Sequence, residues 1–133
     1  MDSARGSRSS PPTLEQRLPF ADRRVFEFFA AWQALRGERL VPYRRDFDPV
    51  AVARLLSSVW LYHYDDERQD FVCRLAGEDV NEAWGGSIAG LSLREVIGEA
   101  DHPVVLARWR NIVRRPAIHY GAAIERMTEQ ELR

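Results

Sequence analysis

Lysine is absent from this chain of 133 residues, so all 19 of its basic residues are arginines. Twenty acidic residues balance them and leave a formal net charge of −1. That balance gives no reason to expect a nucleic-acid partner or an acidic membrane surface. Because the arginines are scattered along the chain, we read their exclusive use as a coding bias rather than as a phosphate-binding function, although the guanidinium fork suits anions.

Cysteine and long apolar runs are also scarce. The single cysteine, Cys73, excludes an intrachain disulfide and indicates a reducing compartment. No apolar run reaches the roughly 18 residues of a membrane-spanning helix, so no membrane segment is predicted. The opening MDSARGSRSSPP lacks the apolar core of a signal peptide. We therefore expect a cytoplasmic protein with a disordered tail over residues 1–19 and one domain over residues 20–133.

The first part of that domain predicts two helices. Phe20–Arg36 has a helical apolar period between Asp22, the expected N-cap, and Gly37, the expected C-terminal glycine. A polar extended linker follows over residues 38–47. Asp48 then caps a short helix with Pro49 at its first position. Its buried side is expected to consist of Val52, Leu55 and Leu56.

The first of these helices is amphipathic, with an apolar band that covers close to half of its circumference. The band consists of Val25, Phe26, Phe28, Phe29, Trp32 and Leu35. Two interpretations stay open: the band covers the sheet of its own chain, or part of it meets another subunit or a partner protein. The residues expected at such an interface are Val25, Phe28, Phe29 and Trp32.

The middle of the chain predicts a β-hairpin roofed by short helices. Residues 59–64 form an apolar, aromatic strand, Asp65–Asp70 a charged loop, and a second strand starts at Phe71 and ends at Gly77. A helical turn is expected at Glu78–Trp84. Three glycines that allow positive φ follow, and Ser92 and Glu95 then form the capping box of a further short helix. These glycines are Gly85, Gly86 and Gly90; that last helix carries Leu93, Val96 and Ile97.

A longer helix is predicted to begin at Asp101 or His102, with Pro103 in its first turn, and to end at Pro116. Its apolar face is expected to carry Val105, Leu106, Trp109, Ile112 and Val113. Arg108, Arg114 and Arg115 should point to water as a solvated face rather than an anion site. Residues 117–127 then read as another strand, with Ile118, Tyr120, Ala122 and Ile124 pointing inward.

Several short motifs occur in a specific order over roughly residues 20–127: Trp32-Gln-Ala-Leu-Arg-Gly37, Pro42, Asp46-Phe-Asp-Pro49, Leu55-Leu56, Arg74-Leu-Ala-Gly77, Trp84-Gly85 and Gly90-Leu91-Ser92-Leu93. In this order they resemble a PAS domain subfamily typical of alphaproteobacteria. The resemblance implies an α+β fold in which short helices cross one face of a small antiparallel sheet. It also implies a sensory or regulatory role in bacterial signalling, without a catalytic residue set.

One departure from the resemblance concerns the C-terminal end. A PAS sheet has five strands, and the last two would follow residues 128–133, so we expect a C-terminally incomplete domain. Three interpretations stay open: a piece of a longer chain, a naturally shortened protein, or a sheet completed by strand pairing with another chain. Of these we favour the shortened protein.

The residues that usually carry chemistry show no catalytic or metal-binding pattern. His63, His102, His119 and Cys73 lack the spacing of metal ligands. His102 is at the start of the helix that holds the iron-ligating histidine of haem PAS domains, but a helix-start histidine beside proline is expected to be a cap or surface residue. Cys73 is expected to be a small buried hydrophobe rather than a flavin-reactive thiol. Glu95 could act as a general base, but its place in the capping box is a sufficient structural reason for a glutamate there.

These observations lead to two hypotheses and to no cofactor. The first is a binding module for a small apolar ligand; the second is a scaffold that docks a partner through its aromatic N-terminal helix and its open sheet edge. An enzyme is not expected. The candidate ligand pocket is lined by Trp60, Phe71, Cys73, Leu75, Val80, Trp84, Ile88, Leu91 and Val96. The same residues would also make an ordinary filled core.

Overall fold

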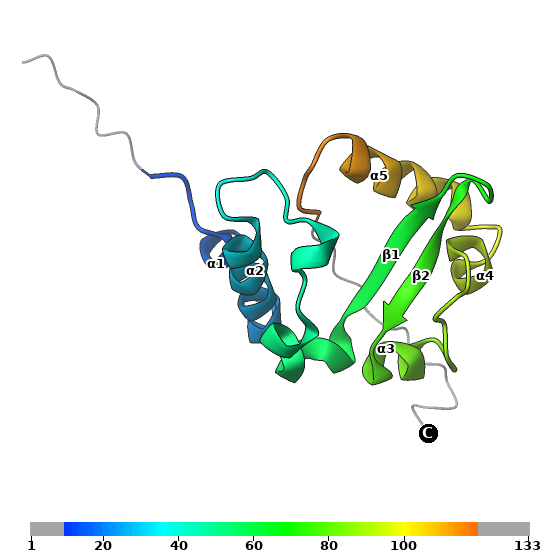
Figure 1. The fold of residues 1–133 in the computed structure, drawn as a ribbon, viewed down its shortest axis with the longest axis horizontal. Helices are drawn as coiled ribbons and strands as arrows, with labels where there is room; N and C mark the ends of the chain where they lie inside the picture. Colours follow the sequence, from blue (N-terminus) through cyan, green and yellow to red (C-terminus); the bar gives the residue numbers. More distant parts are fainter. Residues whose placement is uncertain (1–9, 120–133) are drawn as a thin grey trace, which may run out of the picture. The chain divides into compact units, whose positions relative to one another are not determined.

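The computed structural model describes residues 10–119, which form two compact units. The first comprises residues 10–61 and 75–87, and the second comprises residues 62–74 and 88–119. The chain passes from one unit to the other within the two strands of a small antiparallel sheet, β1 (Trp60–Asp65) and β2 (Asp70–Ala76). The combination of helices with this small antiparallel sheet confirms the predicted α+β class (Figure 1).

The first unit begins with a short helix that the sequence reading missed. Helix α1 (Leu14–Arg17) follows Thr13, whose hydroxyl accepts from the backbone N–H of Gln16 while the Gln16 side chain accepts from the backbone N–H of Thr13. This reciprocal capping box satisfies two backbone donors that a helix start leaves free. The prediction of disorder is therefore wrong for these residues of the tail, and residues 1–9 lie outside the described part of the chain.

Helix α2 (Arg23–Arg36) has the two capping residues that the sequence predicts. The Asp22 carboxylate caps it by accepting from the backbone N–H of Arg24 at 2.8 Å, and Gly37 ends it with a φ of 56°. The helix begins at Arg23 rather than at Phe20, which lies before the cap and is 98% exposed. The expected extended linker contains a 3₁₀ turn, η1 (Arg44–Asp46).

The core of the first unit is built on η2 (Pro49–Ser58), where Asp48 caps as predicted by accepting from the backbone N–H of Val50 at 2.9 Å. This segment is a 3₁₀ helix with a kink at Val52, rather than a regular helix. Val52 and Leu55 are buried and Leu56 is half-buried. Helices α2 and α3 (Glu78–Ala83) both pack against η2.

In the second unit, the segment of residues 90–92, called the glycine loop below, runs along β2. Gly90 donates to the carbonyl of Cys73 at 2.8 Å, Cys73 donates to the carbonyl of Leu91 at 2.9 Å, and Val72 forms an antiparallel bridge with Ser92. A two-stranded hairpin alone is marginally stable, so this further pairing supports β2. Gly85 and Gly90 have the predicted positive φ of 80° and 86°, whereas no positive φ occurs at Gly86.

Helices α4 (Leu93–Ile97) and α5 (His102–Arg114) complete the second unit and pack against each other. The predicted capping box of Ser92 and Glu95 is confirmed. Val113, expected on the apolar face of α5, is 62% exposed. Residues 117–119 are exposed and form no strand, so the predicted strand is wrong there, and residues 120–127 lie outside the described region.

Gly77 offers a direct test of packing in the first unit. Its amide donates to the carbonyl of Val59 at 2.8 Å, and a Cβ at this position would clash with the backbone carbonyls of Leu56 and Ser57. Because these are backbone atoms of η2, the neighbour cannot give way by rotating a side chain. We predict that Gly77→Ala lowers the free energy of unfolding by about 2 kcal/mol or more in urea denaturation.

The matched control is Gly86→Ala, where the added methyl group meets no atom of the described residues within 4 Å and φ is not positive. It should change the free energy of unfolding by no more than about 0.5 kcal/mol. Equal denaturation midpoints for the two variants would contradict the described contact between Gly77 and η2.

Candidate functional site

A buried carboxylate joins three elements of the second unit. Asp70, the first residue of β2, is 4% exposed, although the sequence places it in a charged loop. One of its oxygens, Oδ1, lies 2.9 Å from His102 Nε2 at the start of α5 and accepts from the Phe71 amide at 2.9 Å. The other, Oδ2, accepts from the Arg94 amide at the start of α4 at 3.0 Å. A carboxylate can only accept hydrogen bonds, and both oxygens of this one have partners within the protein.

His102 is the buried partner of this carboxylate, at 2% exposure. The expectation of a helix cap or a surface residue is therefore wrong. Because Asp70 Oδ1 can only accept, Nε2 of His102 is the donor in this pair. Removing either partner of such a buried pair destabilises the protein, because the remaining polar group is left buried without its hydrogen bond.

Four aromatic rings pack beside this pair. Phe71 contacts Tyr64 and Trp109 edge-on, each with 5.3 Å between ring centroids, and Tyr62 contacts Trp109 in the same manner at 4.9 Å. Edge-to-face geometry is the favourable arrangement for such rings and adds about 0.5–1.5 kcal/mol per pair beyond burial. The cluster connects both strands to α5. Trp109 is half-buried in it, which confirms that this residue lies on the apolar face of α5.

Burial changes the chemistry of one ring in this cluster. Desolvation raises the pKa of the Tyr62 phenol above its usual range, and the neighbouring Cys73 thiol and Asp70 carboxylate add to the effect. A raised pKa favours the neutral phenol. The Tyr62 hydroxyl is therefore neutral at physiological pH and is not a general base.

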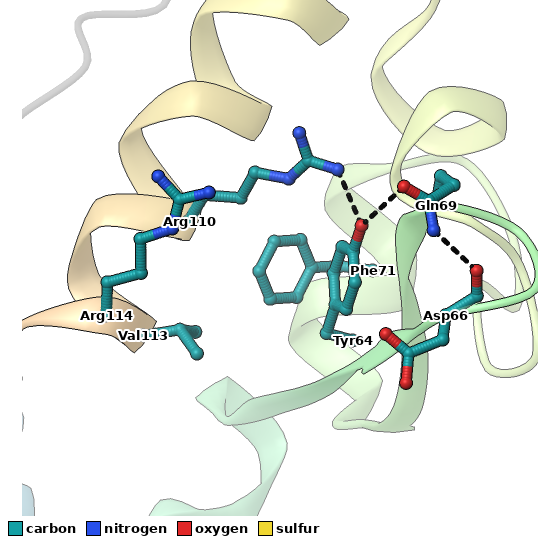
Figure 2. Close-up of a pocket in the computed structure, with 7 residues that line it drawn as sticks. All are labelled: Tyr64, Asp66, Gln69, Phe71, Arg110, Val113 and Arg114. Atoms are coloured by element: carbon teal, nitrogen blue, oxygen red, sulfur yellow. Dashed lines mark hydrogen bonds between the residues drawn. The ribbon is translucent and has the colours of Figure 1, made fainter.

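An open cavity of about 380 Å³ lies where α5 passes the end of the hairpin. Figure 2 shows Arg110 reaching from α5 to the Tyr64 hydroxyl, which also contacts Gln69 from the turn between the strands. The donor–acceptor distances are 2.5 Å from Arg110 Nη2 to Tyr64 Oη and 3.4 Å from Tyr64 Oη to Gln69 Oε1. The cavity is lined by Tyr64, Asp66, Gln69, Phe71, Arg110, Val113 and Arg114.

The turn that closes one side of this cavity is fixed by its own side chains. Asp65 accepts from the backbone amides of Glu67 and Arg68, at 2.9 and 3.1 Å, and these bonds lower the pKa of its carboxyl. Gln69 donates from its side chain to the carbonyl of Asp66 at 2.7 Å and has a φ of 53°. Only Gln69, among the non-glycine residues of the described chain, has positive φ, a conformation unfavourable for residues with a side chain.

The nine residues of the predicted pocket are divided between the two units. In the first, Trp60 and Trp84 stack with 6.3 Å between ring centroids but remain 39% and 44% exposed, and Leu75 and Val80 are half-buried. In the second, Phe71, Cys73 and Ile88 are buried, Val96 is half-buried and Leu91 is 37% exposed. The pocket itself stays a prediction, whereas the burial of Cys73 as a small hydrophobe is confirmed.

The sequence reading missed Asp70, Tyr64 and Arg110 as members of a site. The available signal was weak: an acidic residue at the edge of a charged loop and an arginine one turn after an apolar residue on α5. Within residues 10–119 no group of three or more histidine, cysteine, aspartate or glutamate side chains is placed to hold a metal ion. Over the same residues no helix has the length and apolar character needed to cross a membrane.

Comparison with known proteins adds one finding. A family model described as PAS domain matches residues 21–131, most of the chain. The match includes residues of both units, among them the hairpin with its short helices, and begins after α1. No curated protein and no solved structure matches the chain.

Proposed function

The chain belongs to the PAS domain family, and from that premise we propose that it is a sensory or regulatory module in bacterial signalling, acting by binding and without catalytic activity. PAS domains are generally non-catalytic sensory modules, and the family match therefore supports a role in binding. The single cysteine is buried, and together with the sequence it supports action in the cytoplasm.

The observation that carries the proposal, beside the family match, is how the short helices of the second unit attach to β2. The glycine loop is bonded to Cys73 through two backbone hydrogen bonds, and the start of α4 is bonded to Asp70 through one. These few bonds define one arrangement of loop and helix. A ligand that favours another arrangement shifts the equilibrium by the difference in its affinity for the two states.

The proposed ligand is a small apolar molecule. The candidate residues that lie in the second unit, Phe71, Cys73, Ile88, Leu91 and Val96, are proposed to contact it, and the first three of them are buried. The alternative for these same side chains is a filled core that binds nothing. The two alternatives differ in whether added compounds stabilise the protein.

We predict that an organic extract of the purified protein contains a bound apolar compound, detected by mass spectrometry, and that a metabolite screen by thermal unfolding finds compounds that raise the Tm. A ligand at about 100 times its Kd adds about 2.7 kcal/mol to the free energy of unfolding. An empty extract together with an unchanged Tm across the screen would leave the filled core as the better account.

Two matched substitutions make this screen specific. Val96→Ala removes two methyl groups from a candidate pocket residue on α4, whereas Val104→Ala removes the same groups from an α5 residue that is 63% exposed and outside the candidate set. A compound that raises the Tm of the wild type should raise it less in the Val96 variant and by the same amount in the Val104 variant. Equal loss in both variants would argue against the candidate pocket.

A second candidate function is docking through α2. None of its residues is buried, although it carries four large aromatic side chains, and Phe29 and Trp32 stack at 6.0 Å within the helix. The occupant that we propose is a second copy of this chain, in contact with Val25, Phe28, Phe29 and Trp32.

Light scattering tests this second function. The wild type is predicted to have the mass of a dimer, and the variant with Phe28→Asp and Trp32→Asp the mass of a monomer, because two carboxylates would be desolvated in the interface. Ala34→Asp, at an exposed position of the same helix outside the proposed interface, serves as the control and should remain a dimer. A monomeric wild type would remove the basis of the docking proposal.

A further inference from the structure

We propose that the cavity beside Tyr64 binds a small organic anion, with a carboxylate or phosphate head held by Arg110 and Arg114 and an apolar body against Tyr64 and Val113. This site lies entirely within the second unit. It is distinct from the predicted apolar pocket, with which it shares only Phe71. The ligand class follows from the chemistry of the lining, and the proposal stands or falls independently of the apolar ligand.

The two arginines supply the charge that the head group needs. They are four residues apart on α5 and therefore lie on one face of the helix, one turn from each other. Among residues 10–119 neither forms an ion pair with a carboxylate. A guanidinium offers five N–H donors in a planar fork that matches a carboxylate or a phosphate. Within the described part of the chain, the bond to the Tyr64 hydroxyl occupies one donor nitrogen of Arg110.

Arg110 is held in position before any ligand arrives. Its Nη2 donates to the Tyr64 hydroxyl, and its guanidinium carbon lies 5.3 Å from the centroid of the Tyr64 ring. The Tyr64 hydroxyl is oriented in turn by Gln69, which is fixed to the turn by its bond to the carbonyl of Asp66. This chain of bonds reduces the conformational entropy that Arg110 would otherwise lose on binding.

The rest of the lining limits the size and the charge of the ligand. A volume of about 380 Å³ is at the lower end of the roughly 300–1,000 Å³ of small-molecule pockets. Val113 is 62% exposed and Tyr64 half-buried, so apolar surface is available beside the arginines. Asp66 adds one carboxylate to the lining. One acidic group against two basic ones favours a ligand with a single anionic group over a polyanion.

The exposure of Arg114 agrees with the solvated face predicted from the sequence, and a cation in the last turn also complements the dipole of α5. That role requires no cavity and no aromatic neighbour. Arg110 lies one turn earlier, is half-buried and faces the cavity (Figure 2), which the dipole does not explain.

Calorimetric titration of the full chain with three probes of similar shape tests the proposal: benzoate, phenyl phosphate and the neutral benzamide. We expect saturable binding of benzoate or phenyl phosphate with a Kd of about 1 mM or tighter, and at least tenfold weaker binding of benzamide, since a charged hydrogen-bonded head group contributes about 1.5–3 kcal/mol. The anion that binds more tightly identifies the head group.

Substitutions assign the binding to the cavity. Arg110→Gln and Arg114→Gln should each weaken the anion about tenfold, and Asp66→Asn should tighten it. The control, Arg108→Gln, removes a charge from an exposed residue of the same helix that does not line this cavity, and should leave the Kd within about twofold.

Three results would overturn the proposal: no binding of either anion, equal binding of benzoate and benzamide, or the same loss of affinity in the Arg108 variant as in the Arg110 and Arg114 variants. Thermal unfolding of each variant without probes checks that it folds. Because the apolar-ligand screen uses other residues and other compounds, its outcome and the outcome of this titration can be told apart.

Discussion

The carboxylate of Asp70 is the interaction on which the second unit depends. It accepts from the first amide that follows it in β2, from the amide of Arg94 at the start of α4, and from the ring of His102 at the start of α5. Three elements that are distant in sequence therefore meet at one side chain. A buried carboxylate is costly unless its oxygens are satisfied by hydrogen bonds, and here both oxygens are.

This arrangement explains how a small sheet supports helices as short as α4. A helix of a single turn gains little from its own hydrogen bonds, so its stability must come from its ends and its packing. The capping box of Ser92 and Glu95 satisfies the first turn from within, and Asp70 satisfies the amide of Arg94 from β2. Under the proposed function, these are the bonds on which a ligand would have to act in order to rearrange α4.

Much of the fold could be predicted from the sequence because its signals are local. The caps at Asp22, Asp48 and Ser92 are short-range patterns, and each is confirmed by the backbone bond it makes. The two strands of the hairpin are predicted from their alternation and aromatic content, and they pair as expected. The PAS resemblance, which rests on the order of such motifs, is confirmed by the family match.

The parts that could not be predicted depend on contacts across the chain. His102 looks like an ordinary helix-start residue until Asp70, 32 positions away, is placed beside it. Asp70 itself looks like part of a charged loop, because nothing local shows that its carboxylate turns inward. The same holds for Arg110 and Tyr64, 46 positions apart. The short helix α1 is different, since its capping box, Thr13 with Gln16, is a local pattern in the sequence.

A double-mutant cycle of Asp70→Ala and His102→Ala, measured by urea denaturation, tests the central claim most directly. If Asp70 holds the second unit together, its loss should lower the free energy of unfolding by about 3–5 kcal/mol. The coupling between the two positions should be about 1–3 kcal/mol. Asp66→Ala, at an exposed position in the same turn, supplies the reference and should cost about 0.5 kcal/mol or less. The account would be contradicted if Asp70→Ala lowered the free energy of unfolding as little as Asp66→Ala does, and if the effects of Asp70→Ala and His102→Ala were additive.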